Sequence, residues 1–410
     1  MAHGQYSGSC GTSSLLSSES RRGLFVLVPS MCVSERFDSN VFYKPSSPGL
    51  NREDFVTSVN PVLRVNHEGA YASGYLNVGG FSETYVKNPG LNYFGTSDTL
   101  FLNLDNSIKR WLPNASLSIF DSFRYTPLPP GFVNPAAGTS PSDPANSQNV
   151  YAQGFLASRT NNVINNASVS TSYATTASTS LYASYSYAIL RFLGSSSSST
   201  QGQSLSNSTT QSGTVGGSAQ LSGLDTLNIR FAHMQSEIIS ISGTTSRVFT
   251  SDTATIAWSR ILTPNLRGEL GGGGILIGSG DTSYAANAAL IMNSLNNSAT
   301  ISYARSALPS FLGTGGIMIG DVFSLSAVQR IDRQWQLSES ASYAHTTGTS
   351  GINSVEYNSF FLGGTIEYWV TSIWSATLGY NYSKFNNSSG SAKTDFDRQV
   401  IALSIRATWE

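Results

Sequence analysis

The residues best suited to catalysis are the four histidines. His345 closely follows Glu339 and Ser340, a set of residue types that a Ser/His/Glu hydrolase would use. Such groups must converge within hydrogen-bond reach. If this segment is a strand, however, Ser340 lies on the face opposite to His345, because side chains alternate between faces. The other three histidines fall in the N-terminal tail, in a short turn and at an outward strand position. A hydrolase is therefore the least favoured class, and we expect no enzyme.

Cofactor and metal sites are not indicated either. Gly271–Gly274 lacks the lysine and the following helix of a phosphate loop, and it is more typical of a bend or a thin wall. The two cysteines, Cys10 and Cys32, have no metal-binding spacing. We interpret them as unpaired or incidental thiols. No cofactor is expected.

The remaining candidates for chemistry are charged side chains inside segments that alternate apolar and polar residues. Charge on a lipid-facing surface at mid-bilayer costs about 2–4 kcal/mol for Arg or Lys, so these residues are expected on the opposite, lumen-lining face. They form either a mixed-sign lining that selects solutes or a set of structural ion pairs. The predicted lumen-lining residues are Arg64, Asp105, Arg124, Arg230, Arg267, Glu269, Glu367 and Arg406.

The elements that position these residues show a period of two. In Ile401–Trp409 the odd positions are Ile, Leu, Ile, Ala and Trp, and the even positions are Ala, Ser, Arg and Thr. Trp374–Tyr382 and Leu181–Ile189 repeat the pattern. Side chains of a strand alternate between faces, so each segment has one apolar and one small, polar face.

A second, longer repeat runs along the chain, because short turn signals alternate with longer polar loops. Turns such as Asp332–Gln334 and Thr371–Ile373 each link two strands closely. The alternation predicts a transmembrane antiparallel β-barrel of about 18 strands, with 16 possible, and both termini in the periplasm. The predicted strands are 24–37, 54–66, 70–82, 98–110, 114–126, 161–173, 179–191, 213–222, 226–238, 247–262, 266–277, 284–294, 298–308, 320–331, 335–347, 355–370, 374–386 and 395–409.

Composition agrees with a sheet that has one lipid face and one wet face. Charged residues make up 11% of the chain, against about 25% in an average soluble domain. No segment supplies the ~20 apolar residues of a spanning helix. A Ser/Thr-rich fibre is the rival, but it predicts repeats of fixed length, which are absent. The net charge of −1 gives no reason to expect a nucleic acid partner.

The tryptophans and tyrosines support a membrane location. Trp111, Trp335, Trp369, Trp374 and Trp409 fall beside predicted short turns or at the C-terminus. Another set of aromatic residues sits by the long loops: Tyr43, Tyr93, Tyr125, Phe311 and Phe385. Two aromatic bands are what two membrane interfaces select.

Three stretches resemble a known family: Ser34–Tyr43 (SERFDSNVFY), Tyr85–Thr96 (YVKNPGLNYFGT) and Asp121–Phe132 (DSFRYTPLPPGF). They look like the β-barrel porin family of bacterial outer membranes whose members are found with exopolysaccharide and PEP-CTERM export systems. The resemblance covers about the first third of the chain and is only architectural beyond it. It implies an outer-membrane barrel in a Gram-negative bacterium and leaves the substrate open.

The expected organisation is a disordered tail or incomplete leader over 1–23 and a barrel over 24–410, with long loops at 127–160 and 192–212. The first loop is rich in proline and begins with Leu128, Phe132 and Val133, which we predict to fold over or into the lumen as a constriction. Two functions stay open: a water-filled pore for small polar solutes or polysaccharide, and a non-conducting structural or docking component of an export system. The expected partners are outer-membrane lipid, with envelope export proteins or polysaccharide.

Overall fold

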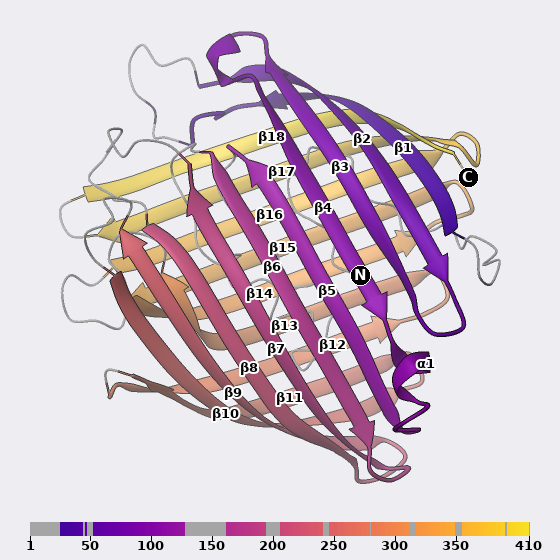
Figure 1. Cartoon of the computed structure of the whole chain (residues 1–410). Coiled ribbons are helices and arrows are strands. Elements are labelled where there is room, and N and C mark those ends of the chain that lie inside the picture. The colour runs from indigo at the N-terminus through magenta and orange to yellow at the C-terminus, as the bar shows by residue number, and fades with distance from the viewer. Residues whose placement is uncertain are drawn as a thin grey trace.

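The protein is a closed antiparallel β-barrel of 18 strands (Figure 1). The computed structural model describes residues 25–43, 46, 52–127, 161–193, 206–240, 246–278, 280–310, 316–348, 355–389 and 392–409. The strands are β1 Phe25–Asp38, β2 Asp54–Glu68, β3 Ser73–Tyr85, β4 Tyr93–Asn103, β5 Ala115–Thr126, β6 Asn162–Ala174, β7 Thr179–Phe192, β8 Ser206–Gln220, β9 Asp225–Ser240, β10 Ser246–Thr263, β11 Leu266–Ile277, β12 Thr282–Asn293, β13 Asn297–Ser310, β14 Gly316–Arg330, β15 Trp335–Gly348, β16 Val355–Trp369, β17 Trp374–Ser389 and β18 Ala392–Thr408.

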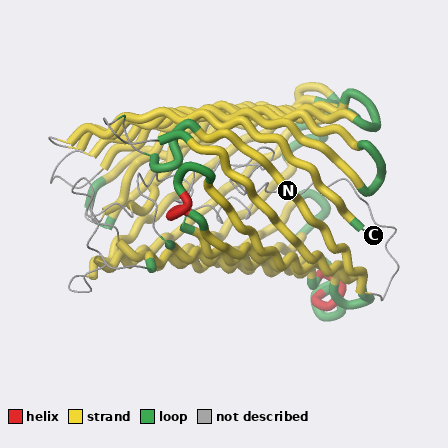
Figure 2. The backbone as a smooth tube through the Cα atoms, turned by 90° about the horizontal axis from the view of Figure 1, so that it is seen from above, coloured by secondary structure: helices red, strands yellow, loops and turns green. Residues whose placement is uncertain are grey.

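Each strand pairs with the next along the chain, and β1 also pairs with β18. The closing register runs from Ser30 opposite Thr408 to Asp38 opposite Val400. Closure gives the backbone groups of the first and last strands partners, as hydrocarbon surroundings require. Figure 2 shows the tilted strands of the wall. The predicted antiparallel barrel and its 18 strands are confirmed.

The two ends of the barrel differ. At one end, here called the short-turn end, hydrogen-bonded turns connect the strands, and β1 begins and β18 ends there. Asp332 Oδ1 accepts hydrogen bonds from the backbone N–H groups of Gln334 and Trp335, at 2.7 and 2.8 Å. These bonds fix a tight turn between β14 and β15, at the predicted position. The opposite end carries most of the longer connections and is called the long-loop end, although β11–β12 and β17–β18 are joined there by short segments.

The two faces of the wall differ as the alternation predicts. On β18, Ile401, Leu403 and Ile405 point outward and are about half exposed, at 49, 55 and 52%. Ala402 and Ser404 between them point inward and are 3 and 2% exposed. The outer surface is therefore an apolar belt and the inner surface is rich in small and polar residues, which is the surface pattern of an outer-membrane barrel.

Two short helices accompany the strands, α1 at Asp105–Ile108 and a 3-10 helix, η1, at Pro89–Leu91. Neither is long or apolar enough to cross a membrane as a helix, and the same holds for every helix in the described ranges. In Figure 1, α1 lies at the same end of the barrel as the C-terminus.

The predicted strand 98–110 is wrong in its second half. β4 ends at Asn103, and α1 follows in the turn. The Asn103 side chain accepts a hydrogen bond from the Asp105 N–H at 2.8 Å, and Asp105 Oδ1 accepts one from the Leu117 N–H at 2.9 Å. These bonds stabilise a local helical turn, and the residues after Asn103 lack the alternation that a strand would need.

β8 begins at Ser206, whereas the prediction placed its start at 213 and a loop at 192–212. The stretch looks like a flexible linker because it is rich in Ser and Thr. Its inward residues nevertheless form contacts with the next strand, for example the 2.9 Å hydrogen bond between Thr210 Oγ1 and Ser236 Oγ. The ladders to β7 and β9 therefore fix a segment whose composition alone suggests a linker.

Cys32 points inward on β1 and is 4% exposed. It is bound in a disulfide, so its interpretation as an unpaired thiol is wrong. The other cysteine, Cys10, lies outside the described residues, as does the predicted tail 1–23. Sequence spacing could not reveal the bond, because no motif marks a thiol on the inner wall of a barrel.

Candidate functional site: the inner wall of the barrel

Arg64 lies on the inward face of β2, in the half of the barrel near the short turns. Its guanidinium carbon is 4.4 Å from the centre of the Tyr75 ring on β3. Its Nε donates a 2.7 Å hydrogen bond to Asn66 Oδ1. Both Arg64 and Tyr75 are half-buried. A cation held over an aromatic face keeps its charge at the lumen surface.

The two charged residues of β11 share the inward face. Arg267 is exposed, and its Nη2 donates a 3.0 Å hydrogen bond to Ser259 Oγ. Glu269 is 2% exposed and accepts a 3.2 Å hydrogen bond from Asn287 Nδ2 on β12. The pair thus presents one accessible cation and one buried anion on the same stretch of wall.

Glu367 on β16 and Arg406 on β18 approach each other across β17. Their closest oxygen and nitrogen are 4.0 Å apart, and both side chains are 12% exposed. On another part of the wall, Arg230 is half-buried, and its Nη2 lies 3.5 Å from Thr214 Oγ1. These predicted lining residues therefore come from separate strands around the barrel and do not converge on a single centre.

Two other predicted lining residues lie elsewhere. Arg124 is on the inward face of β5 but nearer the long-loop end, with its guanidinium carbon 5.8 Å from the centre of the Phe81 ring. Asp105 belongs to α1 in a turn, where it caps the N–H of Leu117, so it is not on a wall strand. The predicted constriction residues Leu128, Phe132 and Val133 lie outside the described residues.

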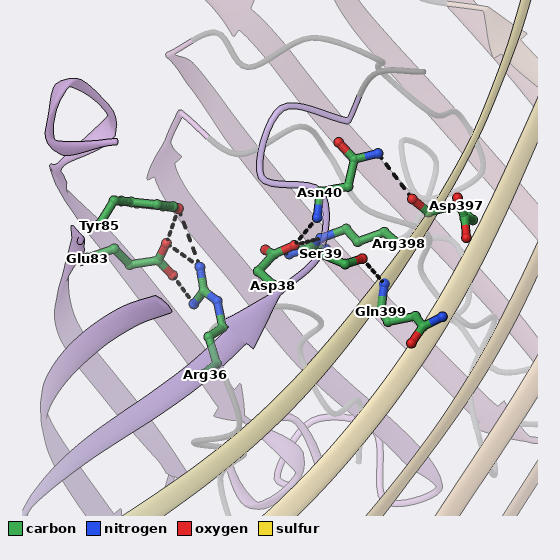
Figure 3. Close-up of polar contacts among 9 residues, drawn as sticks. All are labelled: Arg36, Asp38, Ser39, Asn40, Glu83, Tyr85, Asp397, Arg398 and Gln399. Atoms are coloured by element: carbon green, nitrogen blue, oxygen red, sulfur yellow. Dashed lines mark hydrogen bonds and ion pairs between the residues drawn. The ribbon is translucent and has the colours of Figure 1, made fainter. Parts of the chain in front are cut away.

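Two buried ion pairs near the long loops were missed in the sequence (Figure 3). Arg36 on β1 makes two 2.6 Å hydrogen bonds to the Glu83 carboxylate on β3. The Tyr85 hydroxyl donates to the same carboxylate at 2.7 Å. Arg36 and Glu83 are 5 and 2% exposed. A bidentate pair of this kind is strong and orients both groups.

The second pair joins the two strands that close the barrel. Arg398 on β18 donates from Nε and Nη2 to the Asp38 carboxylate on β1, at 2.9 and 2.5 Å. The Arg398 guanidinium also lies 4.7 Å from the centre of the Tyr43 ring. The even parity of Arg36 and Asp38 on β1 could have indicated that both point inward. Their partners are far away in the sequence, so no spacing could have revealed the pairs.

On some strands burial changes along the inner wall, although Glu269, Ser375 and Ser404 near the short turns are also buried. On β7 the inward residues Ser186, Ala188, Leu190 and Phe192 are buried, whereas Ser180, Tyr182 and Ser184 nearer the short turns are half-buried. β2 shows the same change, from buried Asp54, Val56, Ser58 and Asn60 to half-buried Val62, Arg64 and Asn66. We call the part of the wall near the long loops the occluded half, and the part near the short turns the open half.

The start of the first long connection contributes to the occlusion. Val41, beyond the end of β1, packs on the inward-facing Val56 and Tyr85, and all three are at most 2% exposed. Asn40 donates a 3.1 Å hydrogen bond from its side chain to the backbone oxygen of Asp397 (Figure 3). The connection therefore turns inward over the wall before it continues.

The structure gives the hydrolase candidates no shared site. His345 points outward, and its Nδ1 is 2.8 Å from Asn358 Oδ1. Ser340 has the opposite parity on β15 and points inward. Within the described part of the chain, no group of three or more His, Cys, Asp or Glu side chains is placed to hold a metal ion.

No family model and no curated protein matches the chain. Among solved structures, it is similar to the siderophore receptor PirA from Pseudomonas aeruginosa, at 9% identity and a TM-score of 0.45 over 94% of this chain and 80% of that one. For the FrpB iron transporter from Neisseria meningitidis the values are 9% and 0.45, over 93 and 81%. For OccK2 (OpdF) from Pseudomonas aeruginosa they are 11% and 0.43, over 93 and 98%. At such TM-scores the likeness has no bearing on function. The assignment to the outer membrane rests on the closed barrel and its apolar belt.

Proposed function

We propose that the protein is a pore of the bacterial outer membrane that passes or exports small polar solutes or polysaccharide. The observation that carries this proposal is the lining of the open half, where Arg64, Arg230 and Arg267 share a wall with serine, threonine and asparagine side chains. A barrel of ~16–18 strands is too wide for side chains to fill its interior. A wide polar lumen inside an apolar belt is suited to the passage of hydrated solutes.

The position of the short turns suggests how this pore is oriented in the membrane. The short-turn end, with both ends of the barrel, faces the periplasm in this proposal, because outer-membrane barrels carry their short turns there. The open half then faces the periplasm and the occluded half faces the outside. This arrangement suits a solute that enters from the periplasm and leaves outward. The resemblance to porins found with exopolysaccharide export systems makes a polar polysaccharide one such solute.

The occluded half favours a second candidate function. Its buried ion pairs, Arg36–Glu83 and Arg398–Asp38, close the wall tightly near the long loops. A barrel that remains closed there would serve as a structural or docking component of an envelope export system. Its open half would then receive a segment of a partner protein and pass no solute.

Single-channel recording of the purified, refolded protein in a planar bilayer separates the two functions. The pore predicts discrete conductance steps, and liposomes containing the protein should swell in sugars up to a size limit. Arg230→Glu should shift ion preference toward cations, because Arg230 lies on the inward face. A folded barrel that shows neither conductance nor swelling overturns the pore and favours the docking component.

A further inference from the structure

The wall of the barrel divides between β12 and β13. These strands pair from Asn293 opposite Ser298 as far as Ala286 opposite Arg305, and there the ladder ends. β12 continues to Thr282 with β11 as its neighbour. β13 continues to Ser310, paired with β14. The long-loop end of the β13–β14 hairpin is therefore held by one neighbour fewer than the rest of the wall.

A cluster on the outer face marks the point of division. Arg305 Nη1 is 2.5 Å from Asp321 Oδ2, and the Tyr303 hydroxyl donates to Asp321 Oδ1 at 2.7 Å. The Arg305 guanidinium carbon also lies 4.2 Å from the centre of the Tyr284 ring on β12. These contacts join β12, β13 and β14 just where the ladder stops.

Beyond this point the hairpin end lies inside the barrel. Ile317 and Ile319 have the outward parity of Phe323, which is 54% exposed, yet they are 2 and 4% exposed. They pack against Ile275 and Ile277, which are inward-facing residues of β11. An outward face can meet an inward face only if its strand passes inside the wall.

Two further observations agree with this placement. The inward-facing Met234 of β9 and Phe249 of β10 pack against the same apolar cluster, which we call the seam. β14 also contacts β10 directly, although three strands separate them around the wall. The end of the β13–β14 hairpin therefore crosses the inner face of β9–β12.

The opposite face of this hairpin end points toward the lumen axis. Its apolar residues are Leu308 and Met318, at 9 and 6% exposure, and Val322, on the same face just before the division, is 5% exposed. Nearer the short turns several inward positions of the same two strands carry polar side chains, among them Ser302, Ser324 and Ser326. An apolar stretch within a polar lumen repels water, and a narrow one can close a pore by dewetting.

From this arrangement we propose that the inward-folded end of β13–β14 is a hydrophobic constriction, with Leu308 and Met318 as its inner face and the isoleucine seam as its attachment. The inference rests on the proposed pore function and specifies what controls passage. The constriction discriminates against charged and strongly hydrated solutes when it is narrow. It also places the barrier on wall strands, whereas the sequence suggested the proline-rich loop.

Thiol cross-linking tests the geometry without reference to conductance. In the Ile277→Cys/Ile319→Cys variant, a short bifunctional thiol reagent should join the two side chains, because both belong to the seam. The matched control is Ile277→Cys/Phe323→Cys, which uses the same face of β14 on the exposed outer wall and should not react. Wild-type protein reports reaction at the native cysteines. Equal cross-linking of both pairs, or none in a folded barrel, overturns the inward fold.

Conductance then tests the chemistry. Met318→Gln keeps a side chain of similar length and adds a polar group, so it should raise single-channel conductance or open probability. Ile291→Gln makes a comparable change on the inward face of β12 near the short turns and should have no effect. If wild type conducts and both variants resemble it, the constriction is wrong and the pore stands. If the seam cross-links but no variant conducts, the pore itself is wrong.

Discussion

The assignment of faces predicts opposite results for two neighbouring residues of β17. Leu378 is the middle of the outward run Trp374–Tyr382 and is 51% exposed, with outward Ile366 and Leu403 beside it. Leu378→Arg puts a charge at the centre of the apolar belt. The cost is about 2–4 kcal/mol at the bilayer midplane. Since 1.4 kcal/mol is tenfold, the folding equilibrium should fall by roughly 30- to 1000-fold.

Thr377 provides the control, because it has the opposite parity. It is half-buried on the inner wall, opposite Glu367. Thr377→Arg should therefore leave stability nearly unchanged, since the new cation faces the polar lumen, where Glu367 and Arg406 already lie. Urea unfolding in lipid vesicles, followed by tryptophan fluorescence, measures both variants. Equal losses, or a larger loss for Thr377→Arg, would refute the register, because a one-residue slip exchanges every inward and outward side chain.

Three further variants test the wall. Arg36→Ala should destabilise the barrel by about 3–5 kcal/mol, because it leaves Glu83 buried and unpaired, and the double variant Arg36→Ala/Glu83→Ala should lose less in the same unfolding assay. Gly273→Ala should impair assembly, because its Cβ would overlap a backbone oxygen of β10, whereas the space beside Gly274 is open and Gly274→Ala should assemble normally on a heat-modifiability gel. Arg64→Glu should shift ion selectivity toward cations in bilayer recordings, and unchanged selectivity would place Arg64 off the solute path.

Much of the barrel follows from period two because the membrane imposes it. A wall with lipid on one side and a polar lumen on the other must alternate, so the outward Ile401, Leu403 and Ile405 identify both strand and face. The same alternation places Glu367 and Arg406 inward, where the structure brings them within 4.0 Å. The distance between side chains on strands that are not neighbours depends on the curvature of the barrel. No local sequence pattern predicts this curvature.

The alternation of apolar and polar residues does not show whether an apolar face contacts lipid or protein. Ile317 and Ile319 continue the outward apolar pattern of β14, and this pattern is compatible with contact to lipid or to protein. The inward fold of the β13–β14 end is therefore invisible in the sequence. Similarly, Ser206–Gly213 has Ser and Thr on both faces, so its strand character comes from its neighbours. The bonds that cap α1 also depend on Leu117, beyond the turn itself.

The backbone hydrogen bonds between strands indicate which part of the occluded half can move. Arg36, Glu83, Asp38 and Arg398 lie on β1, β3 and β18. The ladders of β1 with β2, β3 with β2 and β18 with β17 extend to the long-loop ends of these strands. Separating these ion pairs would require breaking ladder hydrogen bonds as well as leaving buried charges unpaired. The β13–β14 end has no ladder to β12 beyond Ala286, so it is held by the β14–β15 ladder on one side only, and its seam is apolar. Exposing two isoleucines costs about 3–6 kcal/mol at roughly 1.5–3 kcal/mol each. Opening of the pore should therefore displace the β13–β14 end and leave the Arg36–Glu83 side of the wall in place.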